Sequence, residues 1–143
     1  MFSAIALIGF AAFTGCKKSD NASNSGNMSE SINGSKVSSP CYSVSNSSIS
    51  TIEGFTASGT SASNVTITYP FIQLGFLSAL STGTFNIDGF TVTAGIDSSA
   101  GNVIYASSGT ITITSITPHT VGTFSFTCSD GTTVTGGTFT SGN

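Results

Sequence analysis

The sequence carries very little charge, and the little it has is unevenly placed. Only 6% of its 143 residues are charged, against roughly 25% in an ordinary soluble domain, and arginine and tryptophan are absent. The three lysines, Lys17, Lys18 and Lys36, all precede Cys41. A domain without cations cannot neutralise phosphates. The sequence therefore predicts no nucleic-acid partner, and no basic patch that would dock on anionic lipid.

Residues that carry catalytic or metal-binding chemistry are also scarce. The chain has one histidine, His119, and it has no C-x-x-C spacing and no G-x-S-x-G motif. Of the four acids in the C-terminal hundred residues, Glu53, Asp88 and Asp130 each precede a glycine. The fourth, Asp97, lies in the loop-like stretch GIDSSAG. We interpret all four as turn residues and His119 as a solvated loop residue. We therefore expect no catalytic residues, no metal, no cofactor and no enzymatic activity.

Apolar and β-branched residues are what the chain has in abundance. Hydrophobic residues make up 38% of the sequence and include eleven phenylalanines, while Ser and Thr together number 49. That apolar content is enough to build the core of one domain of about 100 residues. The enrichment in β-branched and aromatic residues favours strands over helices.

The N-terminal sequence has a pattern typical of an export signal. Residues 2–14, FSAIALIGFAAFT, form an apolar run too short to cross a bilayer, which needs about 20 residues. Phe13, Thr14 and Gly15 then precede Cys16, a pattern that resembles the bacterial lipobox. The resemblance implies that Cys16 is diacylated on sulfur, that the peptide is cut before it, and that the new amine is acylated, with palmitate as a typical chain. An ordinary cleaved signal peptide and a hydrophobic helix buried in the domain stay open as alternatives.

Composition divides the chain into three parts. Residues 1–15 are the expected signal peptide, residues 16–40 the lipidated cysteine with a flexible Ser/Asn-rich tether, and residues 41–143 a single domain. Two further cysteines, Cys41 and Cys128, would be an even pair in an oxidising compartment. Two interpretations of this pair stay open: a disulfide, and two independent thiols.

From about residue 41 the apolar residues recur with a period of two. The alternation predicts that Val92, Ala94 and Ile96 point inward together with Phe90, as do Ile111 with Ile113 and Phe124 with Phe126 and Cys128. The stretch FIQLGFLSAL favours a strand, and Gly136-Gly137 indicates a bulge. Turn-forming residues fall every 8 to 14 residues. We therefore predict an all-β domain, an antiparallel β-sandwich or small barrel of about eight or nine short strands.

The C-terminal stretch SGTITITSITPHTVGTFSFTCSDGTTVTGGTFTSG resembles the signature of an uncharacterised family of small Bacteroidota lipoproteins. In that family a GT-x-T-I-T strand precedes GTFSF and a final V-T-x-G-x-F strand. IEGFTASGTSASNVTI and STGTFNI are similar to its earlier strands, and GCKKSD is typical of the group. The resemblance implies an exported, lipid-anchored β-domain and assigns it no reaction.

The leading functional hypothesis is a non-enzymatic binding or structural module of the cell envelope. The lipid anchor would hold it at the outer membrane, on its periplasmic or surface face, with a glycan, a peptide or an envelope protein as partner. An aromatic platform around Tyr69 or Tyr105 would favour a glycan binder. Two alternatives are an envelope-polymer hydrolase and an adhesin or fimbrial subunit that adds a strand to a partner, with an exposed edge near residues 132–140.

The first testable prediction concerns Cys16. Mass spectrometry of the protein isolated from its native envelope should find Cys16 at the N-terminus with acyl chains attached, because two or three chains are needed for firm anchoring. Cys16→Ser should prevent acylation at this position and leave the apolar segment uncut. A bare Cys16 sulfur with residues 1–15 still attached would contradict the prediction.

Overall fold

The computed structural model describes residues 26–58 and 66–141, and in these ranges it consists of strands and turns. The strands are β1 (Gly26–Ile32), β2 (Ser35–Ser45), β3 (Ser50–Ser58), β4 (Thr66–Phe76), β5 (Gly83–Asn86), β6 (Val92–Ser99), β7 (Asn102–Ser115), β8 (Val121–Cys128) and β9 (Thr133–Thr140). No helix in the described ranges has the length and apolar character that a membrane crossing requires.

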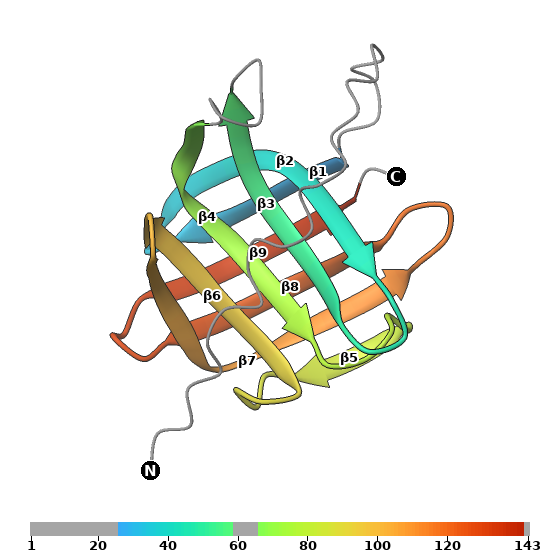
Figure 1. Ribbon diagram of the computed structural model, residues 1–143. Helices are drawn as coiled ribbons and strands as arrows, with labels where there is room; N and C mark the ends of the chain where they lie inside the picture. Colours follow the sequence, from blue (N-terminus) through green and yellow to red (C-terminus); the bar gives the residue numbers. More distant parts are fainter. Residues whose placement is uncertain (1–25, 59–65, 142–143) are drawn as a thin grey trace.

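Eight of the strands close into an antiparallel barrel. Around the barrel the order is β1, β2, β3, β4, β6, β7, β8 and β9, and β9 returns to pair with β1. The ninth strand, β5, lies in the connection between β4 and β6 and pairs with the second half of β7. Figure 1 shows β2, β3, β4 and β6 side by side across the front, with β7, β8 and β9 behind. The predicted all-β class is confirmed, and the architecture is a barrel with one extra strand.

The barrel interior is filled by side chains that alternate along each strand. The inward set is apolar and reaches almost complete burial: Met28, Ile52, Ile72, Leu74, Phe76, Val92, Ala94, Ile96, Ile111, Ile113, Phe124, Phe126, Val134 and Phe139. An eight-stranded barrel is just narrow enough for side chains to fill it. The predicted inward sets on β6, β7 and β8 are confirmed except for Phe90. That side chain is 61% exposed because it lies in the Asp88 turn before β6 begins.

Glycines let two phenylalanines fill the space between β8 and β9. A Cβ on Gly122 would lie 2.5 Å from the Phe139 ring and 2.1 Å from the carbonyl oxygen of Thr112. A Cβ on Gly137 would lie 2.6 Å from the Phe124 ring. The predicted bulge at Gly136-Gly137 is confirmed, since the register of β9 shifts against both neighbours there and Gly136 has a φ of +60°.

The predicted tether is wrong over residues 26–40. This stretch forms β1 and the first half of β2, which pair along their whole shared length. Met28 and Ile32 face the core together with Glu30, so the inward pattern is present but interrupted by an acid. The rest of the predicted leader and tether, including Cys16, lies outside the described residues.

The predicted free edge near residues 132–140 is also wrong. β9 pairs with β1 on one side and with β8 on the other, so both rows of its backbone groups are used. Strand addition needs an unpaired edge, and β9 offers none.

Gly122→Ala should destabilise the barrel by about 1–3 kcal/mol, because the new methyl group meets the backbone of β7 and the Phe139 ring. Urea unfolding measures the loss. Thr123→Ala on the solvent side of the same strand is the matched control and should change the midpoint far less. Equal effects of the two substitutions would contradict the packing described for Gly122.

Candidate functional site

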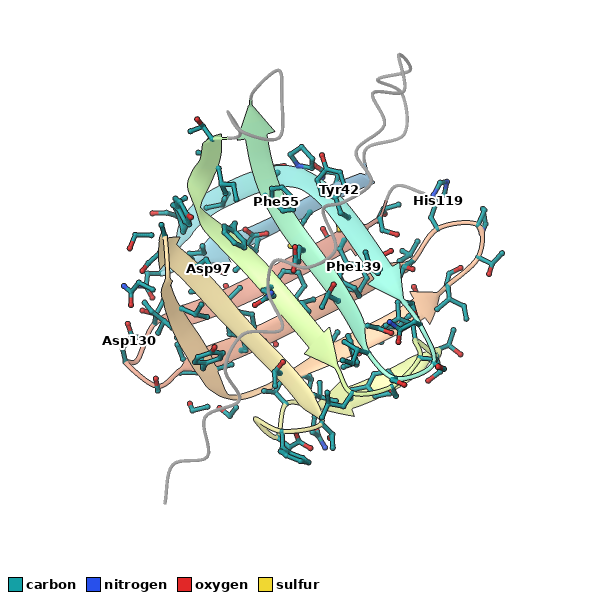
Figure 2. The ribbon with its side chains drawn as sticks, viewed as in Figure 1. Tyr42, Phe55, Asp97, His119, Asp130 and Phe139 are labelled. Carbon is teal, nitrogen blue, oxygen red and sulfur yellow. The ribbon has the colours of Figure 1, made fainter. Side chains whose placement is uncertain are left out.

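Four aromatic side chains form a continuous row on the outside of the barrel. Tyr42 and Phe55 have ring centroids 5.0 Å apart, Phe55 and Phe71 5.9 Å, and Phe71 and Tyr69 5.6 Å. These spacings lie within the range of favourable aromatic pairs. We call Tyr42, Phe55, Phe71 and Tyr69 the aromatic series. Figure 2 shows Tyr42 and Phe55 next to each other over β2 and β3.

The pleat of the strands explains why the aromatic series faces outward. Cys41 and Ile72 point into the core, so their neighbours Tyr42 and Phe71 point to the other side. Phe55 joins them at a register shift between β3 and β4, where β4 passes through Pro70. Tyr42 is 42% exposed, and Phe55 lies beneath it at 8%. The series therefore has an accessible end at Tyr42 and a covered middle at Phe55.

Two acids lie on the same outer face, and here the turn interpretation is wrong. Glu53 is in the middle of β3 and Asp97 is in β6, so both are strand residues. Gln73 of β4 donates from Nε2 to Oε1 of Glu53 at 3.0 Å. Burial raises the pKa of Asp97 and the Glu53 carboxylate raises it further. We call Glu53 and Asp97 the acid pair, because they lie on one outer face on either side of β4 and the charge of Glu53 acts on Asp97.

The other two acids have the turn roles expected from the sequence. Asp88 accepts hydrogen bonds from the backbone N–H groups of Phe90, Thr91 and Val92, at 2.8, 2.7 and 2.9 Å, and from the Thr91 hydroxyl. These bonds hold the pKa of Asp88 well below its usual range. Asp130 accepts from the N–H and hydroxyl of Thr132, which lowers its pKa in the same way.

His119 does not meet any of these acids. It lies in the loop that joins β7 to β8, at one end of the barrel, while Asp130 lies in the turn at the other end of β8 (Figure 2). Its side chain is half-buried rather than solvated, and Nδ1 is buried with no hydrogen-bond partner in the described part of the chain. In residues 26–58 and 66–141 no group of three or more metal-ligating side chains comes together.

Cys41 and Cys128 are buried free thiols, so the disulfide reading is not borne out. Both point into the core, Cys41 from β2 and Cys128 from β8, and the strands β1 and β9 lie between them. Three interstrand steps of about 4.8 Å separate the two strands along the wall, whereas a disulfide needs Cα atoms within about 7 Å. Burial, with the nearby Glu30 as a second cause, raises the pKa of Cys41 to about 12.

Glu30 is a carboxyl group inside the barrel, and the sequence analysis did not single it out. It is 5% exposed, and its Oε2 has no hydrogen-bond partner within the described residues. It lies opposite Val37 on β2, beside the irregular pairing with β9. Burial raises its pKa to about 7. Glu30 is buried on the inner side of β1, and it borders a hollow over β1, β2 and β9.

A hollow of about 470 Å³ lies over β1, β2 and β9, away from the aromatic series. Its lining combines Glu30 and Lys36 with Ser29, Ser31, Ser38 and Thr135, and it includes no aromatic residue. The outer face of β2, β3 and β4 therefore has two features that this hollow lacks: stacked rings and a side-chain amide.

No protein-family model, curated protein or solved structure matches the chain. The aromatic series and the acid pair are accordingly the groups whose chemistry bears on function. Rings on the outer wall can stack on a ligand, and the amide and carboxylates beside them can form hydrogen bonds with it.

Glu30 makes the stability of the barrel depend on pH. Its pKa of about 7 in the folded protein exceeds the ordinary glutamate value of 4.5, so the folded state holds a proton that the unfolded chain loses between these values. Stability should therefore fall as the pH rises from about 4.5 to 7, by on the order of 3 kcal/mol. Glu30→Gln should remove this part of the fall and leave the part that Asp97 contributes in the same direction.

Urea midpoints measured across this pH range test the prediction. Glu53→Gln, the same change on the outer face, is the control and should keep most of the fall. A Glu30→Gln profile parallel to that of the unaltered protein would show that Glu30 is ionised and solvated in the folded state.

Proposed function

We propose that the protein is an exported, lipid-anchored module of the cell envelope that binds a glycan on the outer face of β2, β3, β4 and β6 and catalyses no reaction. The observation that carries the proposal is the aromatic series with Gln73 and the acid pair beside it. Anchoring through Cys16 would place this face at the outer membrane, where envelope glycans are within reach of the domain.

The aromatic series supports stacking of sugar rings. A pyranose has an apolar face of C–H bonds, and an aromatic ring packs against it over a large area with little loss of side-chain entropy. Three strands contribute the four rings, so the binding surface is held by the barrel wall and does not depend on loops. Tyr42, the most exposed ring of the series, offers the first contact. Tyr105, 55% exposed on β7 opposite Gly95, extends the same face.

The polar groups beside the rings support recognition of hydroxyl groups. Glu53 and Gln73 form a side-chain pair of defined geometry, with one carboxylate oxygen left to accept from a ligand. Binding sites of this kind combine a largely apolar surface with a few fixed polar groups that set orientation. An amide and a carboxylate on adjacent strands match the vicinal hydroxyls of a sugar.

A hydrolase is the second candidate, and the acid pair is the observation that favours it. Paired carboxylates flank the scissile bond in most glycosidases, one as acid and the other as base or nucleophile. Here Glu53 is already bonded to Gln73, and both acids lie on a convex wall. Binding without cleavage is therefore the better-supported function.

Binding of the domain to a panel of immobilised oligosaccharides tests the proposal. Tyr42→Ala should weaken binding of any retained glycan about tenfold, close to 1.4 kcal/mol, because it removes the exposed ring. Phe90→Ala is the matched control: it removes an exposed ring about 20 Å along the sheet from Phe71 and should leave binding unchanged.

The same incubations, analysed for shortened products, separate binding from hydrolysis. Intact oligosaccharides support the binding module, and shortened ones that disappear with Glu53→Gln favour the hydrolase. Equal losses for Tyr42→Ala and Phe90→Ala would place the binding surface elsewhere on the barrel.

A further inference from the structure

The outer face that carries the aromatic series has negative charge that no cation balances. Glu53 and Asp97 both lie on it. Lys36 is the only lysine or arginine in the described part of the chain, and it lies six residues before Tyr42 on β2. At about 3.3 Å per residue this is a separation of about 20 Å, well beyond the reach of an ion pair. A ligand with a positive group would complement this face, and an anionic ligand would be repelled.

Of the two acids on this face, Asp97 is the one that is buried. It is 8% exposed, and none of the hydrogen bonds among the described residues reaches its carboxylate. Burial and the charge of Glu53 both work against ionisation, as the raised pKa of Asp97 reflects. A cation placed beside the acid pair would relieve both penalties at once.

The aromatic series brings a ring to the same position. Phe71 lies directly opposite Asp97 in the register of β4 and β6. Its ring is flanked by Phe55 and Tyr69, with centroids 5.9 and 5.6 Å away. The negative face of an aromatic ring attracts a cation within about 6 Å of its centroid. Ring and carboxylate can therefore act on one positive group together.

We propose that the glycan recognised by this face carries free amino groups, and that one protonated amine lies between the Phe71 ring and the carboxylates of Asp97 and Glu53. This inference rests on the proposed function: the aromatic series stacks the sugar rings, and the acid pair selects the charged ring. N-acetylation removes the charge and adds bulk at the same atom, so an N-acetylated glycan is a poorer ligand. Carboxylated and sulfated glycans are excluded by the same charges.

Two oligosaccharides of equal length test the inference, one of glucosamine units and one of N-acetylglucosamine units. At slightly acidic pH and low salt, calorimetry should give at least a tenfold tighter Kd for the amine form. Raised salt should reduce the difference, because exposed charges are screened. Asp97→Asn should abolish most of the preference while keeping the shape of the side chain, and Glu53→Gln should do so in part.

Asp130→Asn is the matched control. It removes one acid from the turn between β8 and β9, keeps an acceptor oxygen for Thr132, and should leave the preference intact. A preference that falls equally with Asp130→Asn and Asp97→Asn would reflect only the overall negative charge of the protein and would overturn the inference. Thermal unfolding confirms that each variant is folded.

The outcomes separate this inference from the proposed function. Equal binding of the amine and N-acetyl forms, with both lost in Tyr42→Ala, overturns the amine site and leaves the glycan-binding face in place. A lower Kd for the amine form than for the N-acetyl form, with the difference lost in Asp97→Asn, supports the inference. Absence of binding to either form and to the rest of the oligosaccharide panel overturns both.

Discussion

The closure of the sheet by β1 and β9 is the constraint on which the rest of the structure depends. Without this pairing the eight strands would form an open meander with two unpaired edges. With it, every inward residue faces others across a narrow interior, and large side chains can fill that interior only where small ones make room. Gly122 and Gly137 provide that room for Phe139 and Phe124 at the closing strands.

Closure also determines where a binding surface can lie. The interior is filled by the apolar core, and β9 has partners on both sides, so neither is an evident binding surface in the described part of the chain. What is left is the outer face and the loops at the two ends. On most of the outer face threonine and serine meet water, but on β2, β3 and β4 that pattern gives way to the aromatic series. This local departure from the regular pattern of the wall is the basis of the proposed binding surface.

The sequence predicted the parts of the fold in which alternation is strong. Ile111 with Ile113 and Phe124 with Phe126 have clean polar neighbours, and their strands are as expected. β1 was missed because its inward positions read Met28, Glu30 and Ile32, and a carboxylate in the middle of three inward residues hides the period of two. The acid pair was missed because a glycine after Glu53 looks like a turn when the partner strand is unknown. The aromatic series could not be found, since only the register of β2, β3 and β4 makes its members neighbours.

The pKa shifts of the acids after Cys41 and of Glu30 show which carboxylates a cationic ligand would stabilise. Asp88 and Asp130 have lowered pKa values because hydrogen bonds within their turns stabilise the charged carboxylates, so these charges are stable without a ligand. Glu30 and Asp97 have raised pKa values, so each opposes folding when it is ionised. Glu30 is buried in the wall beside the hollow over β1, β2 and β9, which Lys36 also lines. Asp97 lies on the outside of the same wall, beside an aromatic ring and a second carboxylate. A cationic group on the proposed glycan ligand would therefore recover at Asp97 the stability that ionisation of this carboxyl group costs.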